Sequence, residues 1–157
     1  MKIRLVMMGK TKEQFTDEGY SFYKNRVVNY LPFDDLIIPG LKNSGGFTPD
    51  EFRWREGELL MKHTRDDDFL VLLDERGKAF TSRDFARFVQ QRMNTGIKTL
   101  TFIIGGAYGF SDEVYKAAHF KLSLSSMTFP HQLVRIVFME QLYRAMTILR
   151  NEPYHNE

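Results

Sequence analysis

The chain is organised around the stretch LSSMTFPHQ, residues 124–132. This stretch joins a short predicted strand to the longest apolar helix that the sequence predicts. Small polar residues alternate there with Leu124, Met127 and Phe129. Such a segment can offer backbone N–H and C=O groups to a ligand without bulky side chains in the way. Pro130 then suits the first turn of a helix, where its missing N–H costs nothing.

The helix that follows is predicted over residues 130–150, and apolar side chains cover most of its circumference. A helix of this kind is buried on two sides, so we expect a partner subunit to cover one of them. Glu140 and Arg144 have the spacing of an ion pair on one helix face. Arg135 lies on nearly the opposite face from Arg144. Two interpretations of Arg135 stay open, an ion pair on the helix surface or a contact with RNA phosphate or the dimer's site.

Upstream of this helix, predicted strands alternate with predicted helices. The strands are residues 2–8, 35–38, 69–73, 99–104 and 120–124. The run FLVLL at 69–73 is typical of a strand buried on both faces. Helices are expected over 13–30, after capping signals at Thr48 and Thr81, and from Ser111, where acidic residues suit a helix start. The second helix carries Glu56 on the same face as Phe52. This order predicts an α/β fold with a parallel sheet, in a single domain spanning residues 1–157.

Composition narrows the classes of function. No run of eighteen apolar residues is present, and the N-terminus does not have the pattern of a signal peptide. We therefore expect a cytoplasmic protein with neither a membrane nor DNA as partner. The four histidines are far apart and there is no cysteine, so no metal site is predicted. The net charge of +2 means that RNA binding would need a local patch.

Three loops follow the carboxyl ends of predicted strands, where ligands bind in open α/β sheets. They are residues 73–77 (LDERG), 105–109 (GGAYG) and 124–129 (LSSMTF). GGAYG lacks the spacing of a dinucleotide-binding loop, and alone it indicates a turn; beside LSSMTF it indicates a site. The glycine-rich stretch at 40–46 has two interpretations, a mobile connection or a loop that orders over RNA or substrate.

Several segments together resemble the SPOUT-class ribosomal RNA large subunit methyltransferase H family. They are MKIRLVMMGK, REGELL, VLLDERGK, IIGGAYG, LSSMTFPHQLVRIVFMEQLYRA and the ending NEPYH, in the family's order and spacing. The resemblance covers nearly the whole chain. It implies the α/β-knot fold with a C-terminal trefoil knot, a homodimer, and S-adenosyl-L-methionine as the methyl donor.

The resemblance also implies which residues bind the cofactor, and they belong to the same three loops. Leu73 and Gly105 come from the first two loops. The third loop contributes Leu124, Ser125, Ser126, Met127, Thr128 and Phe129.

The implied reaction is methylation of N3 of a pseudouridine in 23S ribosomal RNA, on the large subunit or the assembled ribosome. The sulfonium is already activated, so orientation and removal of the N3 proton are the tasks left to the enzyme. Two alternatives stay open. One is a SPOUT methyltransferase that acts on another RNA nucleotide or a ribose hydroxyl. The other is a catalytically idle module that binds RNA or the ribosome.

The tail, residues 151–157, completes the predictions. Pro153 is expected to end the helix and to send the tail along an extended path. By resemblance, Tyr154 and His155 complete the partner subunit's active site, with Arg144 nearby. His155 then acts either as the base or as a group that positions the acceptor. The competing interpretation is a frayed chain end.

Overall fold

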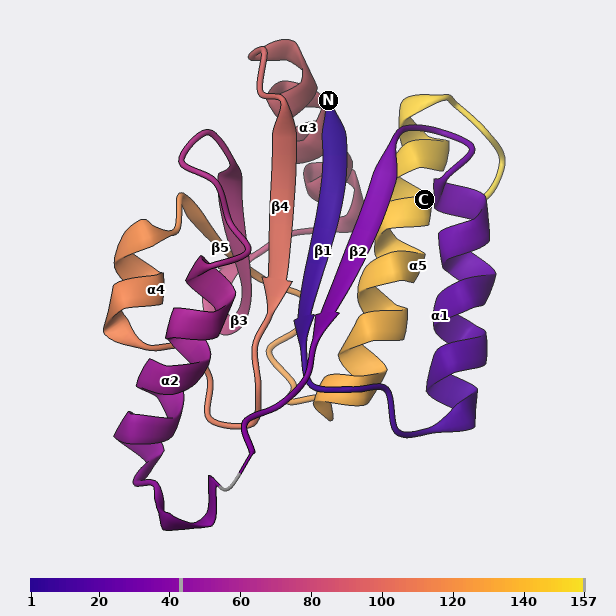
Figure 1. Ribbon diagram of the computed structural model, residues 1–157. Coiled ribbons are helices and arrows are strands. Elements are labelled where there is room, and N and C mark those ends of the chain that lie inside the picture. Colours follow the sequence, from indigo (N-terminus) through magenta and orange to yellow (C-terminus); the bar gives the residue numbers. More distant parts are fainter. Residues whose placement is uncertain (43, 157) are drawn as a thin grey trace.

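Five strands form the central sheet of the computed structural model, which describes residues 1–42 and 44–156 (Figure 1). In spatial order they are β2 (Phe33–Ile38), β1 (Lys2–Met8), β4 (Thr99–Ile104), β3 (Phe69–Ala79) and β5 (Phe120–Ser123). All neighbouring strands are parallel. The predicted α/β fold with a parallel sheet is therefore confirmed.

Helices cover both faces of this sheet (Figure 1). On one face α1 (Gln14–Val27), α3 (Ser82–Asn94) and α5 (His131–Leu149) pack together, with α5 in contact with both of the others. On the other face lie α2 (Pro49–Met61) and the short α4 (Asp112–Ala117).

Strand residues alternate between the two cores, as the period of two along a strand requires. In β1, Leu5 and Met7 join the core under α5, whereas Val6 and Met8 join the core under α2 and α4. Both cores are built on consecutive residues of the same strands, which explains why these strands read as continuous apolar runs.

The predicted capping signals start helices where expected. The Thr48 hydroxyl accepts a hydrogen bond from the Glu51 N–H, and Thr81 forms a full capping box with Asp84. Ser111 caps α4 in the same way, through the N–H of Val114. These bonds satisfy N–H groups that a helix terminus otherwise leaves without partners.

Strand β3 differs from its prediction, which ended at Leu73. It pairs with β5 up to Leu73, leaves the ladder, and pairs again from Lys78 to Ala79. The irregularity between these two stretches is a bulge, and a Cβ on Gly77 would lie 2.6 Å from the Lys121 backbone. Cross-strand pairing that no local pattern indicates therefore extends the strand to Ala79, and residues 74–77 form the bulge within it.

Arg135 has neither of the roles considered from the sequence. It is 1% exposed, and its guanidinium donates to the carbonyl oxygens of Met8 at 3.0 Å and Gly9 at 2.6 Å. It also donates to the Thr11 hydroxyl at 3.2 Å. Arg135 thus ties the start of α5 to the end of β1, and it is buried away from any RNA or partner surface.

The predicted extended path of the tail is wrong. Asn151 has a φ of 55°, a left-handed conformation that reverses the chain just after α5. The Glu152 N–H then donates to the Thr147 carbonyl, and the Tyr30 hydroxyl donates to the Glu152 carboxylate at 2.6 Å. The helix ends at this reversal, before Pro153, and the tail packs back on α1 and α5.

Two further findings concern the rest of the chain. Within the glycine-rich stretch at 40–46, Asn43 lies outside the described residues, and Ser44–Gly46 form a short 3-10 turn. Among the residues that the structure describes, no helix is both long enough and apolar enough to cross a membrane.

Candidate functional site

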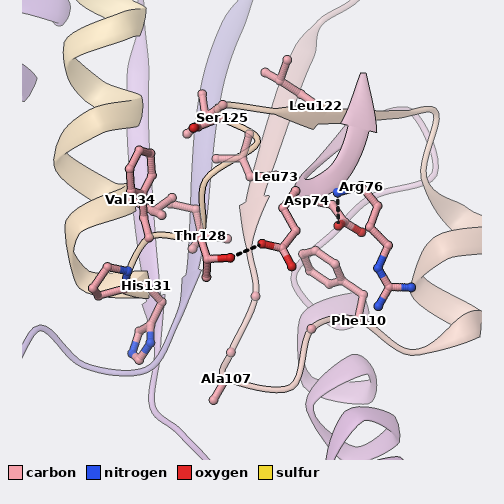
Figure 2. Close-up of a pocket in the computed structure, with 18 of the residues that line it drawn as sticks. Leu73, Asp74, Arg76, Ala107, Phe110, Leu122, Ser125, Thr128, His131 and Val134 are labelled. Carbon is pink, nitrogen blue, oxygen red and sulfur yellow. Dashed lines mark hydrogen bonds between the residues drawn. The ribbon is translucent and has the colours of Figure 1, made fainter. Parts of the chain in front are cut away.

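A cavity of about 520 Å³ opens at the carboxyl ends of β3, β4 and β5 (Figure 2). Residues 73–76 at the bulge of β3 and the loops after β4 and β5 form part of its wall, and the start of α5 closes one side through His131 and Val134. The volume lies in the range of small-molecule sites, and the position is the usual one in open α/β sheets.

The structure brings together seven of the eight predicted cofactor residues. Leu73, Gly105, Leu124, Ser125, Met127, Thr128 and Phe129 all line the cavity. Ser126 does not line it, and its side chain is exposed.

Local hydrogen bonds shape the loop before α5. The Ser123 hydroxyl donates to the Ser125 carbonyl, and the Met127 N–H donates to the Ser125 hydroxyl, both at 2.9 Å. Across the cavity, the Thr128 hydroxyl donates to the Glu75 carboxylate at 2.9 Å (Figure 2). Short polar side chains therefore hold the turn, and one of them joins two walls.

Acidic groups lie at the wall that follows β3. The Tyr115 hydroxyl donates a short hydrogen bond to the Asp74 carboxylate, which also accepts from the Arg76 N–H at 2.9 Å. Burial, followed by this bond to Asp74, raises the pKa of Tyr115 to about 12. On the opposite side, burial and then the charges of Arg135 and Lys12 lower the pKa of His131. At neutral pH the cavity wall therefore presents the protonated Tyr115 hydroxyl and a neutral His131.

The sequence reasoning did not single out several lining residues: Asp74, Glu75, Phe110, Tyr115, Leu122, His131 and Val134. Asp74 and Glu75 directly follow the FLVLL run, inside a loop that was expected to line the site, and this was the available signal. Phe110 and His131 adjoin two of the expected loops. No local signal marks Tyr115, because only the packing of α4 brings it to Asp74.

A second polar cluster lies near the end of α5. The Arg144 guanidinium donates to Glu140 at 2.5 and 3.0 Å, and its Nη1 lies 3.2 Å from Nδ1 of His155. The Tyr154 hydroxyl donates to the same Glu140 oxygen at 3.1 Å, and its ring lies 4.7 Å from the Arg144 guanidinium carbon. The three predicted catalytic residues therefore lie together around Glu140.

Two groups of this cluster, Tyr154 and Arg144, have raised pKa values. Burial, together with the hydrogen bond to Glu140, raises the pKa of Tyr154 to about 12. The pKa of Arg144 is raised as well, because the bond and charge of Glu140 outweigh the opposing effect of burial. At neutral pH the cluster therefore presents a phenol O–H and a guanidinium as donors.

Within one chain the cavity and this cluster are apart. Val134 lines the cavity and Arg144 is ten residues further along α5, a rise of about 15 Å. In Figure 1 the tail lies at the opposite end of α5 from the carboxyl edge of the sheet. A single chain therefore does not bring the cluster to its own cavity.

Comparison with known proteins identifies the class to which this fold and site belong. The family described as predicted SPOUT methyltransferase matches residues 1–155, and the chain belongs to this family. A Parabacteroides distasonis protein named Ribosomal RNA large subunit methyltransferase H is 50% identical over the full length of both chains. Proteins of the same name from Christiangramia forsetii and Flavobacterium johnsoniae are 51% and 48% identical, covering 99% and 100% of each chain.

Methyltransferases of this family use S-adenosyl-L-methionine as the methyl donor. The cavity fits this cofactor in three respects. Its volume is sufficient, and apolar residues such as Leu73, Ile104 and Leu122 can hold a planar base. Asp74 and Glu75 supply negative charge for a cationic ligand that carries no phosphate.

Proposed function

We propose that this protein transfers the methyl group of S-adenosyl-L-methionine to N3 of a pseudouridine in 23S ribosomal RNA. The observation that carries the proposal is the cavity formed by Leu73, Gly105 and the 124–129 loop at three neighbouring strand ends. Relatives about half identical over their full length bear a name that specifies large-subunit ribosomal RNA. An RNA of the ribosome also implies that the protein works in the cytoplasm.

When bound in this cavity, S-adenosyl-L-methionine would supply an activated methyl group for transfer to N3. The backbone of residues 124–129 and the apolar side chains of the cavity orient the donor, and exclusion of water favours the transfer. The N3 proton must leave as the new bond forms. His155 takes this proton or positions the acceptor, while Tyr154 and Arg144 donate hydrogen bonds to the developing negative charge.

We further propose a homodimer in which the tail of one subunit completes the cavity of the other. The 15 Å separation along α5 supports this arrangement, because an antiparallel partner helix would bring a second tail close to the cavity. The outward side of α5 also carries partly exposed apolar residues. Leu133 is 36% exposed, and Val137 and Ile148 are partly buried along the same helix. A second copy would cover them.

We also infer two features of the chain's architecture, a single domain and a knot. We infer a single methyltransferase domain over residues 1–157, which the family match over residues 1–155 supports. We also infer the trefoil knot of the family at the C-terminal half. In its support, the 124–129 loop lines the same cavity as residues 73–76 of β3 and the loop after β4.

Mass analysis of 23S ribosomal RNA from a deletion strain tests the function. Loss of one methyl group on a pseudouridine, restored by the wild-type gene, is the expected result. Loss of a methyl group from another nucleotide or from a ribose would contradict the proposed acceptor. An unchanged pattern of modification, together with altered ribosome binding, would indicate a binding module.

A further inference from the structure

Helix α2 packs tightly on the loop after β4. The ring of Phe52 meets the ring of Tyr108 edge to face at 5.1 Å between centroids, and Arg53 donates to the Tyr108 carbonyl at 3.5 Å. A Cβ on Gly57 would lie 2.6 Å from the Ser111 hydroxyl, so only a glycine fits there. One face of α2 therefore supports a loop whose other side lines the cavity.

Glu56 lies in the middle of this contact. It is 4% exposed, and a Cβ on Gly106 would lie 2.5 Å from Oε1 and 2.6 Å from Oε2 of its carboxyl group. Oε1 has no hydrogen-bond partner among the described residues. The Glu56 carboxyl thus lies directly behind the backbone of Gly106, which lines the cavity.

This arrangement is costly for folding alone, because a buried carboxyl without a partner loses its hydration and gains nothing in return. Burial raises the pKa of Glu56 to about 7, so both of its charge states are accessible near neutral pH. No charged neighbour contributes to this shift. Besides Glu56, the titratable groups on α2, on the loop after β4 and on α4 are Asp50, Glu51, Arg53, Arg55, Glu58, Tyr108, Asp112, Glu113, Tyr115 and Lys116.

On the sheet side of α2, β1 contributes the apolar Val6 and Met8 to the shared core. Arg53 forms an ion pair with Asp50, and Tyr115 is bonded to Asp74. Burial alone accounts for the shifted pKa of Glu56, so no cation on the described parts of these elements balances its ionised carboxyl. A cation in the cavity, beyond Gly106, would fill that role.

We propose that Glu56 is a selectivity residue for the methyl donor, whose ionised carboxyl favours the positively charged sulfonium over the neutral thioether that remains after transfer. The inference rests on the proposed use of S-adenosyl-L-methionine. Two opposite unit charges roughly 10 Å apart, at an effective dielectric constant of about 20, attract each other strongly enough to raise the affinity for the cationic ligand about tenfold. Such a bias would promote release of the product and reloading of the donor.

The electrostatic coupling also works in the other direction. A cationic donor in the cavity favours loss of the Glu56 proton, so donor binding releases protons near pH 7. The amino and carboxylate groups of the ligand are common to donor and product, so the ratio of the two affinities isolates the sulfonium. His131, which lines the cavity and whose pKa is lowered, has to be separated from Glu56.

Calorimetric binding of S-adenosyl-L-methionine and S-adenosyl-L-homocysteine at pH 6 and pH 8 tests the inference. In the wild-type protein we expect the donor-to-product affinity ratio to rise severalfold, up to about tenfold, between these pH values. Glu56→Gln should remove that rise. Glu51→Gln, the same change on an exposed part of α2, should retain it, and so should His131→Asn.

The outcomes separate the two proposals. If wild-type protein binds both ligands and Glu56→Gln leaves the pH-dependent ratio unchanged, the role of Glu56 is refuted while the proposed function stands. If wild-type protein binds neither ligand, both are refuted. If Glu56 had a purely structural role, Glu56→Gln would weaken the binding of both ligands equally. The donor-to-product affinity ratio, and its change with pH, would then stay as in the wild-type protein.

A second measurement needs no variant. Binding of the donor to wild-type protein at pH 7, in buffers of different ionisation enthalpy, should release a larger fraction of a proton than binding of the product. Equal release for the two ligands would overturn the inference even if Glu56→Gln fails to fold.

Discussion

The cavity at the strand ends and the cluster at the end of α5 are built by different means. The cavity is shaped by turns, glycines and apolar side chains, and Ser125 acts there mainly by bonding to its own loop. The cluster consists of four side chains, Glu140, Arg144, Tyr154 and His155, that bond to one another. Backbone shape suits the recognition of a constant cofactor, whereas placed donors suit a reaction in which charge develops.

The two regions should therefore respond differently to mutation. Removing a side chain should matter little in the cavity wall and greatly in the cluster. Enlarging a side chain should matter greatly in the cavity wall and little in the cluster.

Deleting residues 154–157 removes Tyr154 and His155 and should cause the largest loss. We expect methylation of ribosomes to fall by about a hundredfold or more, the scale of a lost acid–base group. Binding of S-adenosyl-L-methionine by calorimetry should stay within about twofold, because the cavity is formed elsewhere in the chain. Full activity of the deleted protein would refute the role of the tail.

Gly105→Val should have the converse effect. A Cβ at this position would lie 2.9 Å from the Phe110 ring, so the added methyl groups push this ring into the cavity. We expect cofactor affinity to fall by about tenfold or more, the scale of an overpacked site. Sedimentation should show an unchanged oligomeric state. Wild-type affinity in a folded Gly105→Val protein would contradict this placement of the cofactor.

Mixing the two variants tests whether the regions meet across subunits. Heterodimers would contain one complete site, with the cavity from the tail-deleted subunit and the tail from the Gly105→Val subunit. Random exchange should then restore about a quarter of wild-type activity, since half of the dimers carry one of two sites. Proven heterodimers without activity would exclude a shared site.

The pH dependence of stability should differ between Glu56, which lies behind the cavity wall, and Tyr154 in the cluster. The pKa of Glu56 is raised from 4.5 to about 7 on folding. Its contribution to the free energy of unfolding is therefore full below pH 4.5 and is lost as the pH rises to about 7. The loss is on the order of 3 kcal/mol. Tyr154, with its pKa near 12, keeps its proton throughout this range.

Urea unfolding at pH 5 and pH 8, at one protein concentration, measures this effect. Glu56→Gln should remove most of the difference between the two pH values, and Glu51→Gln should leave it unchanged. An equal pH dependence in wild type and Glu56→Gln would mean that Glu56 titrates normally in the folded protein.

Ser126→Ala should have the smallest effect. This side chain belongs to the expected cofactor loop but is exposed and does not line the cavity. We expect a change in cofactor affinity of less than about twofold, as for most surface substitutions. A loss of tenfold would show that the side chain, and not only the backbone, recognises the cofactor.

Much of this architecture was predictable from local pattern. The apolar runs indicated parallel strands, and Thr48 and Thr81 marked helix starts because a cap depends on neighbours three residues away. The three strand-end loops could be chosen as the site because carboxyl ends of parallel strands meet at one edge. Resemblance to a known family then predicted which loop residues bind the cofactor, and Ser126 is the one of them that the structure places outside the cavity lining.

Tertiary structure alone decided the features that depend on partners distant in sequence. Arg135 is buried because the carbonyl groups at the end of β1 lie beside it, and nothing within α5 indicates them. The tail folds back because the Tyr30 hydroxyl donates a hydrogen bond to Glu152 and the Glu140 carboxylate accepts one from the Tyr154 hydroxyl. Glu56 looked like one polar residue on a helix face, but packing of α2 on Gly106 deprived it of water. Sequence patterns report neighbours along the chain, and burial depends on contacts that only the folded chain creates.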